Sequence, residues 1–454
     1  MTTGTVQLRG TKAIASSAEG PTTARIVRNP WALVVLLFLT AVGSYLCRVN
    51  ISVVGALMMR DLGFSQIDMG RLFSAFVLGY AMFQIPAGAA ADRWGARLVL
   101  GLGAFTWVLA TAGMSALGWL PLGGATVSAF VILLGLRFIL GVAESPTFPA
   151  AAQGVAQWIA PVHQGFANGI VLGALGAGSA IAPAVLSRVM VHWGWRIALL
   201  SSALPALLVA CTWMTLRGAS RPSPRRTEAR IAGGRSETLW SRSFVLLTLS
   251  YTLEGYVGYI FIFWFYLYLV DVRHFDLLRA GSLSSLPGVL SLISIPMGGF
   301  ISDRLVTGTM GARWGRRVIP MLGLAGSGVL LVLGAGTDSA GAAVVYLALA
   351  MAAVLSVEGP FWATMMEVAP ARTGTAGGVM NCGSNIGGMI SPALTPILAA
   401  YMGWKHALYV AAGLSFVGAA LWLGISPSVS EDRLPPENLS GALVDAGEGL
   451  PGKS

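Results

Sequence analysis

WALVVLLFLTAVGSYLCRVNISVVGALMM, residues 31–59, is an almost entirely apolar run that contains one arginine, Arg48. A helix needs about 20 predominantly apolar residues to cross the hydrocarbon core of a bilayer, and this run is long enough. Charged side chains inside such a segment usually face a cavity or a charged partner rather than lipid. The stretch therefore predicts a membrane-spanning helix with an inward-facing arginine.

Similar apolar runs recur along nearly the whole chain of 454 residues, which is 55% hydrophobic and only 11% charged. Typical soluble domains carry about 25% charged residues. The sequence thus predicts an all-α membrane protein with twelve transmembrane helices. The expected spans are 31–57, 68–90, 97–117, 125–152, 165–190, 195–216, 243–270, 281–303, 317–336, 341–366, 374–400 and 404–425.

Most of the 29 lysines and arginines fall in the connections on one side of these spans and in the two tails. The positive-inside rule makes that side cytoplasmic, so both termini are expected in the cytoplasm and no nucleic-acid partner is implied. The predicted organisation is a tail (1–30), a six-helix bundle (31–216), a linker (217–242), a second six-helix bundle (243–425) and a disordered tail (426–454).

The two halves repeat each other in sequence. GAAADRWGAR at 88–97 matches GFISDR at 299–304, AESPTFPA at 143–150 matches VEGPFWAT at 357–364, and HWGWRIAL at 192–199 matches YMGWKHAL at 401–408. A constant order of matches indicates an internal duplication. Two parallel pseudo-symmetric repeats with a midplane site between them are one architecture of secondary transporters.

The chain resembles the major facilitator superfamily over about residues 31–425. The resemblance lies in Gly88, Asp92, Arg93, Gly95 and Arg97, with a partial copy at Gly299, Asp303 and Arg304. It is more similar to the anion:cation symporter branch of sialin-like and sugar-acid transporters. That similarity lies in YLCRVN (45–50), AFVLGYAMFQIPAG (75–88), RFILGVAESPTFPA (137–150) and GPFWA (359–363).

This resemblance implies import of a small organic anion, a sugar acid or related hydroxy-carboxylate, with proton symport by alternating access in the cell (inner) membrane. It assigns the Gly88–Arg97 motif, with Asp303 and Arg304, to gating. We include Tyr80 and Trp362, from the motifs of spans two and ten, among the substrate-binding residues. No enzyme activity, cofactor or metal is expected, and the protein is expected to work as a monomer in the lipid bilayer.

Arg48 has two interpretations. It either forms a structural salt bridge or binds a substrate carboxylate, which its planar guanidinium can grip in bidentate fashion. The resemblance implies the second role. Tyr45, three residues earlier on the same helix face, can donate its hydroxyl to the same anion.

Arg137 and Glu144 are seven residues apart, which places both on one side of a helix about 10 Å from each other. Glu144 is the candidate proton carrier, because burial disfavours its charge and a nearby arginine favours it. The alternative is a hydrogen bond that only packs helices. Pro146 and Pro149 follow directly and predict a bend in this span.

Span eleven places Asn381, Ser384 and Asn385 on one polar face, suited to hydrogen bonds with substrate hydroxyls. Secondary candidates are Glu254 and Tyr251 in the aromatic seventh span, and Glu358, the repeat partner of Glu144. For the aromatic residues around Glu254, plain helix packing is the alternative, and Glu358 can equally be structural.

Cys47 is also a secondary candidate, because related sugar-acid symporters commonly carry an acidic residue at this position. A neutral cysteine leaves two alternatives: coupling that rests on Glu144, or an uncoupled facilitator. A drug efflux antiporter is less consistent with a buried arginine. A membrane enzyme lacks a nucleophile–base set or metal site in the sequence, and a transporter-like sensor would bind without net flux.

Overall fold

The computed structural model describes residues 30–117, 126–159, 161–216, 240–308, 310–369 and 373–426. These residues form helices and no strand. The first half contains α1 (Pro30–Leu62), α2 (Gln66–Trp94), α3 (Ala96–Ala116), α4 (Thr126–Glu144), α5 (Thr147–Trp158), α6 (Pro161–Leu172) and α7 (Ala174–Thr215). The second half contains α9 (Arg242–Asp271), α10 (Leu277–Ser284), α11 (Leu286–Thr307), α12 (Gly311–Gly336), α13 (Ala340–Leu355), α14 (Glu358–Val368), α15 (Thr373–Met402), α16 (Trp404–Leu421) and the 3-10 helix η2 (Trp422–Gly424). The predicted tails and nearly all of the linker lie outside the described residues.

Ten segments of the described chain are long and apolar enough to cross a membrane. One of them, Ala167–Thr215, bends back at Gly194 and therefore holds two crossings. Helix α15 is 30 residues long but falls outside the ten, since glycines and polar residues lower its hydropathy. With these two additions the described helices account for the twelve predicted spans.

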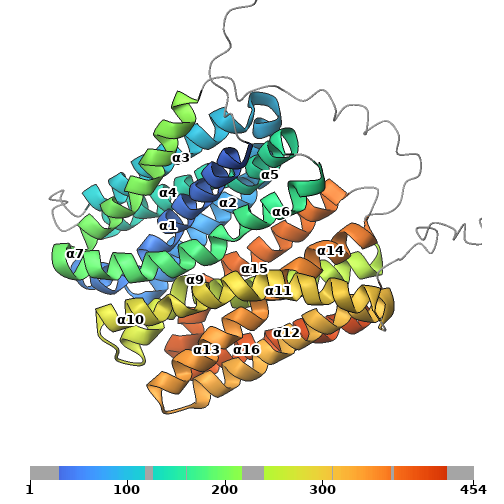
Figure 1. The fold of residues 1–454 in the computed structure, drawn as a ribbon. Coiled ribbons are helices and arrows are strands. Elements are labelled where there is room, and N and C mark those ends of the chain that lie inside the picture. The colour runs from blue at the N-terminus through green and yellow to red at the C-terminus, as the bar shows by residue number, and fades with distance from the viewer. Residues whose placement is uncertain are drawn as a thin grey trace, which may run out of the picture.

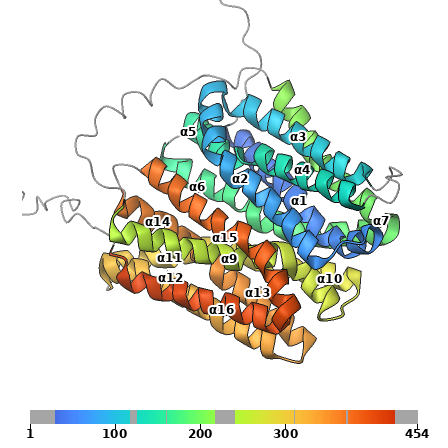
Figure 2. The ribbon, with the colours of Figure 1, turned by 180° about the vertical axis from the view of Figure 1, so that it is seen from behind.

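The helices gather into two groups, which Figure 1 and Figure 2 show from opposite sides. The first group (blue to green) is α1–α7, and the second (yellow-green to red) is α9–η2. Between the groups, α1 packs against α9, α2 against α15, and α7 against α10 and α11. The interior face between them is therefore made from both halves of the sequence.

The sequence repeat reappears as repeated irregularities of the helices. Helix α4 ends at Glu144 and α5 begins at Thr147, so the span bends at Pro146 as predicted. Its repeat partner breaks in the same place, between the end of α13 at Leu355 and the start of α14 at Glu358. Gly194 and Gly403 both adopt positive φ, 83° and 81°, which favours glycine at these turns.

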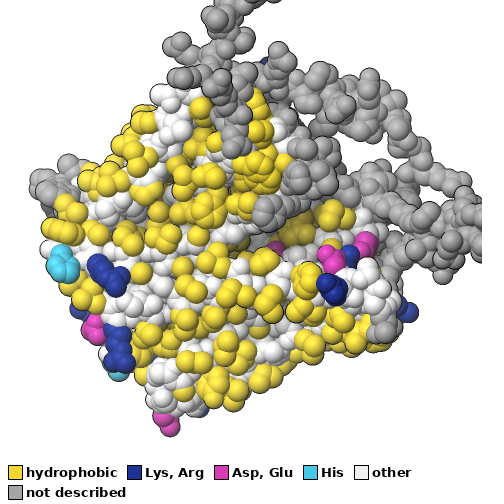
Figure 3. All heavy atoms as spheres, in the orientation of Figure 1, with side chains coloured by type: hydrophobic (Ala, Val, Ile, Leu, Met, Phe, Trp, Pro, Cys, Tyr) yellow, Lys and Arg dark blue, Asp and Glu magenta, His cyan; other side chains and the backbone are white. Residues whose placement is uncertain are grey.

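The outer surface carries a broad apolar belt (Figure 3). In this view the charged and histidine side chains lie towards two opposite ends of the molecule, with hydrophobic side chains between them. Large exposed apolar residues such as Leu208 and Ile85 belong to this surface. A belt of this kind suits a multi-pass membrane protein.

The two groups are joined at one end, where α1 ends and α2 begins. There Gln66 Nε2 donates to Asp271 Oδ2 at 3.1 Å, and Ser74 Oγ donates to the backbone oxygen of Met389 at 2.7 Å. The rings of Phe73 and Phe263 stack with centroids 4.8 Å apart. We call this end, defined by these three pairs, the closed end.

Candidate functional site

The centre of the first helix group holds a buried ion pair. Arg48, 3% exposed, extends from α1 and places Nη2 3.2 Å from Oε2 of Glu144, which is fully buried at the end of α4. Arg48 Nε also donates to the same oxygen at 3.2 Å. Ser44, one turn before Arg48, donates its hydroxyl to Oε2 at 2.9 Å. The structure thus forms the salt bridge that the sequence left as one of two interpretations.

Three aromatic rings surround the guanidinium of Arg48. Its Cζ lies 4.6 Å from the ring centroid of Tyr45, 4.7 Å from that of Tyr80 and 5.1 Å from that of Phe76. Cation–π contacts of this kind stabilise a desolvated cation and fix its orientation. We call Arg48, Glu144 and these three rings the arginine cage.

Arg137 lies behind the arginine cage. Its Nη1 and Nη2 donate to the backbone oxygens of Cys47 and Arg48, at 3.5 and 3.4 Å, and its Cζ lies 4.7 Å from the Phe76 ring. Arg137 therefore holds α4 against the middle of α1. Its two terminal nitrogens are directed at main-chain atoms of α1, so it forms the back wall of the cage.

The arginine cage and the adjoining Arg137 together carry an unbalanced charge. Among the described residues of the first half, the buried charged groups are Arg48, Arg137 and Glu144, which leaves one net positive charge when all three are ionised. One carboxylate oxygen, Oε1 of Glu144, has no hydrogen-bond partner among the described residues. Buried charges of this kind are unfavourable unless paired. The arrangement can accept one further negative charge.

Cys47 faces away from Arg48. Its Sγ lies 3.6 Å from the backbone oxygen of Ser202 on α7, in the interior of the first helix group. The side chain is fully buried and lies within electrostatic range of Glu144 and Arg137. Position 47 therefore borders the back of the cage rather than the face between the two groups.

The polar face predicted for span eleven lies against α9. Tyr259 donates its hydroxyl to Oδ1 of Asn385 at 3.0 Å, and Asn385 Nδ2 donates to the backbone oxygen of Asn381 at 2.9 Å. Ser384 lies beside Glu254. Tyr259 is also within electrostatic range of Arg48, which connects this face to the arginine cage.

Two carboxylates accompany this face in the second group. Glu254 of α9 is 3% exposed, and it interacts with Glu358 at the start of α14. Tyr251 donates its hydroxyl to Glu358 Oε2 at 2.8 Å. Trp362, one turn further along α14, interacts with both Tyr251 and Glu358. These four residues, which we call the acidic face, include both secondary carboxylate candidates.

The residues of the predicted gating motif make contacts within each helix group. Arg97 Nε and Nη2 donate to the last carbonyls of α7, those of Trp213 and Met214, at 3.1 and 2.9 Å. Gly95 joins α2 to α3 with φ 82°. Gly88 lies near Pro149 of α5 and Arg93 is exposed. The side chain of Asp92 lies outside the described part.

In the second half, the motif's counterpart has a partner that sequence reasoning did not identify. Arg316 of α12 pairs with Asp303 at 2.5 Å and with Glu367 of α14 at 2.8 Å. Arg304 lies over the ring of Phe300. Arg316 lies near the start of the helix that follows the motif. Only this position in the sequence could have indicated that it pairs with the motif.

Three further residues of the site were missed or left unassigned. Ser44 lies four residues before Arg48, so helical spacing alone could have indicated it. Phe76 lies four residues before Tyr80 and could have been found in the same way. Tyr259 was one of several aromatic residues in span seven, and nothing in the sequence separated it from the others.

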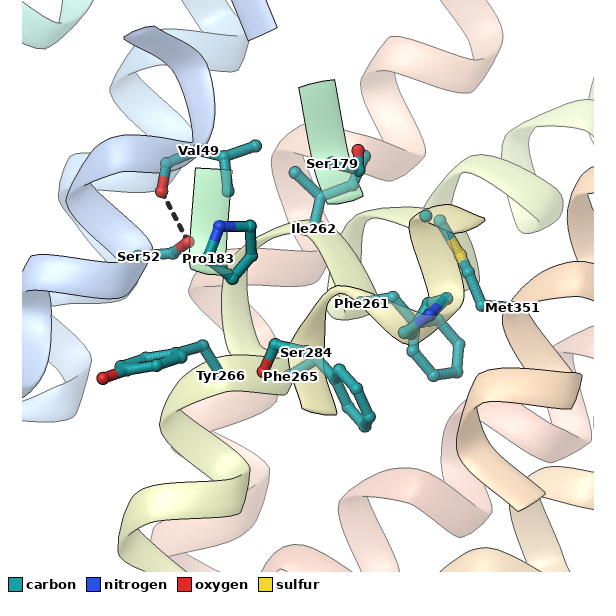
Figure 4. A pocket seen from close by; sticks show the side chains of 12 residues that line it. Val49, Ser52, Ser179, Pro183, Phe261, Ile262, Phe265, Tyr266, Ser284 and Met351 are labelled. Carbon is teal, nitrogen blue, oxygen red and sulfur yellow. Dashed lines mark hydrogen bonds between the residues drawn. The ribbon is translucent and has the colours of Figure 1, made fainter. Parts of the chain in front are cut away.

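A small pocket lies between the two groups, on the closed-end side of Arg48 (Figure 4). It encloses about 30 Å³, room for a water molecule or two. The Ser284 hydroxyl in its wall has no partner among the described residues. The lining is Val49, Ser52, Ser179, Pro183, Phe261, Ile262, Phe265, Tyr266, Ser284, Pro287, Gly288 and Met351. This pocket itself is therefore limited to the size of water.

Within the described residues there is no group of three or more histidine, cysteine, aspartate or glutamate side chains that could hold a metal ion.

Comparison with known proteins supplies the family. The sequence profile described as Major Facilitator Superfamily matches residues 36–392 and 305–446. The probable sulfoacetate transporter of Cupriavidus necator is 30% identical over 89% of this chain and 95% of its own length. In Bacillus subtilis, the probable galactarate/D-glucarate transporter is 28% identical, over 87% of this chain and 88% of its own. The hexuronate transporter of the same organism is 26% identical, over 86% and 92%.

Solved structures show the same fold. A bacterial homologue of the human lysosomal transporter Spinster, in an inward-facing and occupied conformation, superposes with a TM-score of 0.73. The match covers 89% of this chain and 98% of that one at 19% sequence identity. At this identity the likeness speaks for the arrangement of helices alone.

Proposed function

The chain belongs to the major facilitator superfamily of membrane transporters, and from this premise we propose that it carries a small organic anion together with a proton. The anion is a sugar acid or a related hydroxy-carboxylate, as it is for several relatives. The observation that carries the proposal is the buried pair of Arg48 and Glu144, which together with Arg137 carries one unbalanced positive charge. The membrane proteins it resembles are transporters, not enzymes.

The two members of the pair have complementary tasks. Arg48 offers a planar fork of donors to a substrate carboxylate, and Tyr45 and Tyr80 flank it. When the anion takes the guanidinium, Glu144 loses its main counter-charge and retains the hydroxyl of Ser44. A buried carboxylate without a counter-ion binds a proton. Anion and proton therefore load together.

Arg137 has a positioning role in this scheme. Its bonds to the carbonyls of Cys47 and Arg48 fix the part of α1 from which Arg48 projects. Its charge also limits how far Glu144 becomes neutral, because the two groups are within electrostatic range. Release of the proton follows when the anion leaves and Arg48 returns to Glu144.

The remaining expectations from the sequence accompany this proposal. We place the protein in the cell inner membrane as a monomer, with both termini in the cytoplasm, since the basic connections lie on that side. The closed end then faces outwards. Asn381, Ser384, Asn385 and Trp362 contact the non-acidic part of the substrate, and the Gly88–Arg97 motif with Asp303 and Arg304 serves the cytoplasmic gate.

Proteoliposomes test the coupling directly. Wild-type protein should accumulate a labelled sugar acid when the outside is more acidic, and a protonophore should abolish the accumulation. Glu144→Gln cannot release a proton, so it should exchange labelled for unlabelled substrate while losing proton-driven accumulation. Arg48→Gln should lose both activities, and undiminished uptake by this variant would overturn the proposal.

The same assay distinguishes the proposed symporter from an uncoupled facilitator. The facilitator is the second candidate, because position 47 holds a neutral cysteine. It would equilibrate the sugar acid without accumulating it, whatever the direction of the proton gradient. Wild-type uptake that is insensitive to both the gradient and the protonophore would establish the facilitator in place of the symporter.

A further inference from the structure

The pocket of Figure 4 lies where two interrupted helices from different groups meet. Helix α7 of the first group contains Pro183, and α10 of the second group ends at Ser284, two residues before α11 begins. The backbones approach closely beside the pocket, since a Cβ atom on Gly288 would lie 2.5 Å from the backbone nitrogen of Ala180. Helix α1 completes the wall with Ser52. Both groups therefore enclose the pocket, on faces that part when the closed end opens.

Polar atoms from three helices border this mostly apolar space. The hydroxyl of Ser284, in a side chain that is 7% exposed, has no partner among the described residues. Pro183 has no N–H group, so the carbonyl of Ser179, four residues earlier in α7, lacks its helical donor. Ser52 donates its hydroxyl to the backbone oxygen of Val49 at 2.7 Å, and its own oxygen can still accept. One donor and two acceptors thus lie around the pocket.

From this arrangement we infer that the pocket is a water-binding site that joins the two helix groups. Ser284 donates to the oxygen of the bound water, and the water donates its hydrogens to the Ser179 carbonyl and the Ser52 hydroxyl. A buried water needs two to four polar partners and about 10–15 Å³ of space. The pocket offers three such partners and encloses about 30 Å³. The water also gives the buried hydroxyl of Ser284 the partner that its burial requires.

A cation is the other ligand that hydroxyl and carbonyl oxygens hold in membrane transporters. The nearby charges oppose it here. Ser52 lies four residues after Arg48 on the same face of α1, and the described residues of the lining include no carboxylate. A cation in this pocket would be repelled by the guanidinium one turn away, through surroundings of low dielectric. A small neutral molecule that both donates and accepts fits the site.

Water at this place gives the two groups a contact that opens easily. When α7 and α10 separate, the three serines exchange the enclosed water for bulk water and lose no hydrogen bond. A dry apolar contact would instead have to be exposed to water at every opening, which is unfavourable. The inference concerns the contact between the groups, so it does not depend on which anion is carried or on proton coupling.

X-ray radiolysis tests the water directly, because hydroxyl radicals formed from enclosed water oxidise the side chains beside it. Met351 lines the pocket and is 5% exposed, whereas Met365 is 3% exposed and lies outside the lining. The full chain is used in nanodiscs, with Gln66→Cys and Asp271→Cys joined by a bismaleimide so that the closed end stays shut. Mass spectrometry should find Met351 oxidised several-fold faster than Met365. Equally slow oxidation of both would overturn the water site.

A variant identifies the hydroxyl that holds the water. Ser284→Val fills the pocket with an apolar side chain and removes the donor, so Met351 should be oxidised as slowly as Met365. Ser282→Val makes the same change at an exposed position of α10 and should leave the oxidation of Met351 fast. Thermal unfolding checks that both variants are folded. Fast oxidation of Met351 in folded Ser284→Val would overturn the assignment to Ser284.

The role of the water in opening is tested without the cross-link. Val49→Cys, in the pocket wall, reacts with a water-soluble maleimide when the groups separate. Adding Ser284→Val should slow this reaction several-fold, because opening would expose an apolar side chain, whereas adding Ser282→Val should not. Equal rates in the two double variants would overturn the role of the pocket in opening.

Sodium distinguishes a bound cation from water. Exchange of choline chloride for sodium chloride at equal concentration should leave the melting temperature of the wild-type chain unchanged. A rise that Ser284→Val abolishes would identify a cation site and overturn the assignment to water. Each of these measurements is made without a sugar acid, so a negative result leaves the proposed function to its own test in proteoliposomes.

Discussion

Arg48 illustrates how a single residue can be costly and useful for the same reason. A charge at the centre of a membrane helix costs roughly 2.5–3.5 kcal/mol on insertion scales. Glu144 and three aromatic rings offset this cost. In the proposed function a substrate carboxylate replaces Glu144, so the partner that stabilises Arg48 is also the group that responds to binding.

Cys47 provides a prediction at the same scale. An aspartate at this position would place a second carboxylate close to Arg137 and Glu144, because the cysteine side chain is within electrostatic range of both. Cys47→Asp should therefore bind an additional proton, and uptake should fall more steeply as the pH rises. The measurement is the initial rate of sugar-acid uptake between pH 5 and 8 in proteoliposomes.

Cys47→Asn is the matched control for this experiment, since it has the same shape as aspartate and cannot ionise. A difference between the pH profiles of the two variants isolates the effect of the charge. Identical profiles would show that position 47 has no part in coupling. The side chain would then only pack against Ser202 inside the first helix group.

At the residue scale, sequence reasoning found the charges but not their partners. Arg48 and Glu144 are conspicuous because each interrupts an apolar run. That they bind each other could not be predicted, since they lie on different helices and each had several candidate partners. Tyr259 could not be singled out for a similar reason: it connects Arg48 with Asn385, and only the packing of α9 against α1 and α15 creates that position.

Among the elements, α2 and α4 determine the shape of the cage. They approach so closely that a Cβ atom on Gly141 would collide with the backbone oxygen of Phe76, and one on Gly79 with that of Phe138. Glycine is needed here for the approach of two backbones. The contact sets the distance between Phe76 and Tyr80 on one helix and Arg137 and Glu144 on the other.

Gly141→Ala should therefore separate α2 from α4 and loosen the cage. We expect a loss of about 1–3 kcal/mol in stability, as for overpacked cores, together with weaker sugar-acid binding. Thermal unfolding in detergent with and without ligand measures both effects. Gly135→Ala, on the same helix with nothing near the added Cβ, should change neither. Equal behaviour of the two variants would contradict the argument.

One of the two helix breaks could not be predicted from the positions of prolines. Spans four and ten were each predicted as one helix, and a break in span four was indicated by its prolines. The corresponding break between α13 and α14 has no proline at the break itself, at Ser356 and Val357. It was foreseeable only through the repeat. Helix α15 is less apolar than the other spans, yet its apolar run predicted span eleven at 374–400.

At the scale of the whole molecule, the contacts within each helix group differ from the contacts between the two groups. Each group is held together internally, as by Asp61 with Arg196 in the first and Arg316 with Asp303 in the second. Between the groups, the described side-chain hydrogen bonds are the two at the closed end. Two rigid groups with few bonds between them can rock about the central site, and the sequence repeat predicted this division.

A cross-link at the closed end should consequently stop transport without preventing binding. Gln66→Cys with Asp271→Cys, in a background with Cys211 and Cys382 replaced by serine, should react with a short bis-methanethiosulfonate reagent, which forms reducible disulfides, because the native side chains meet at 3.1 Å. Asp61→Cys with Arg196→Cys joins α1 to α7 within one group and should be cross-linked without loss of uptake.

Reduction of the cross-link between Gln66→Cys and Asp271→Cys should restore transport. Because the cross-link leaves the residues of the arginine cage unchanged, calorimetry should still detect the sugar acid. Undiminished uptake after complete cross-linking of Gln66→Cys and Asp271→Cys would contradict the rocking of one group against the other.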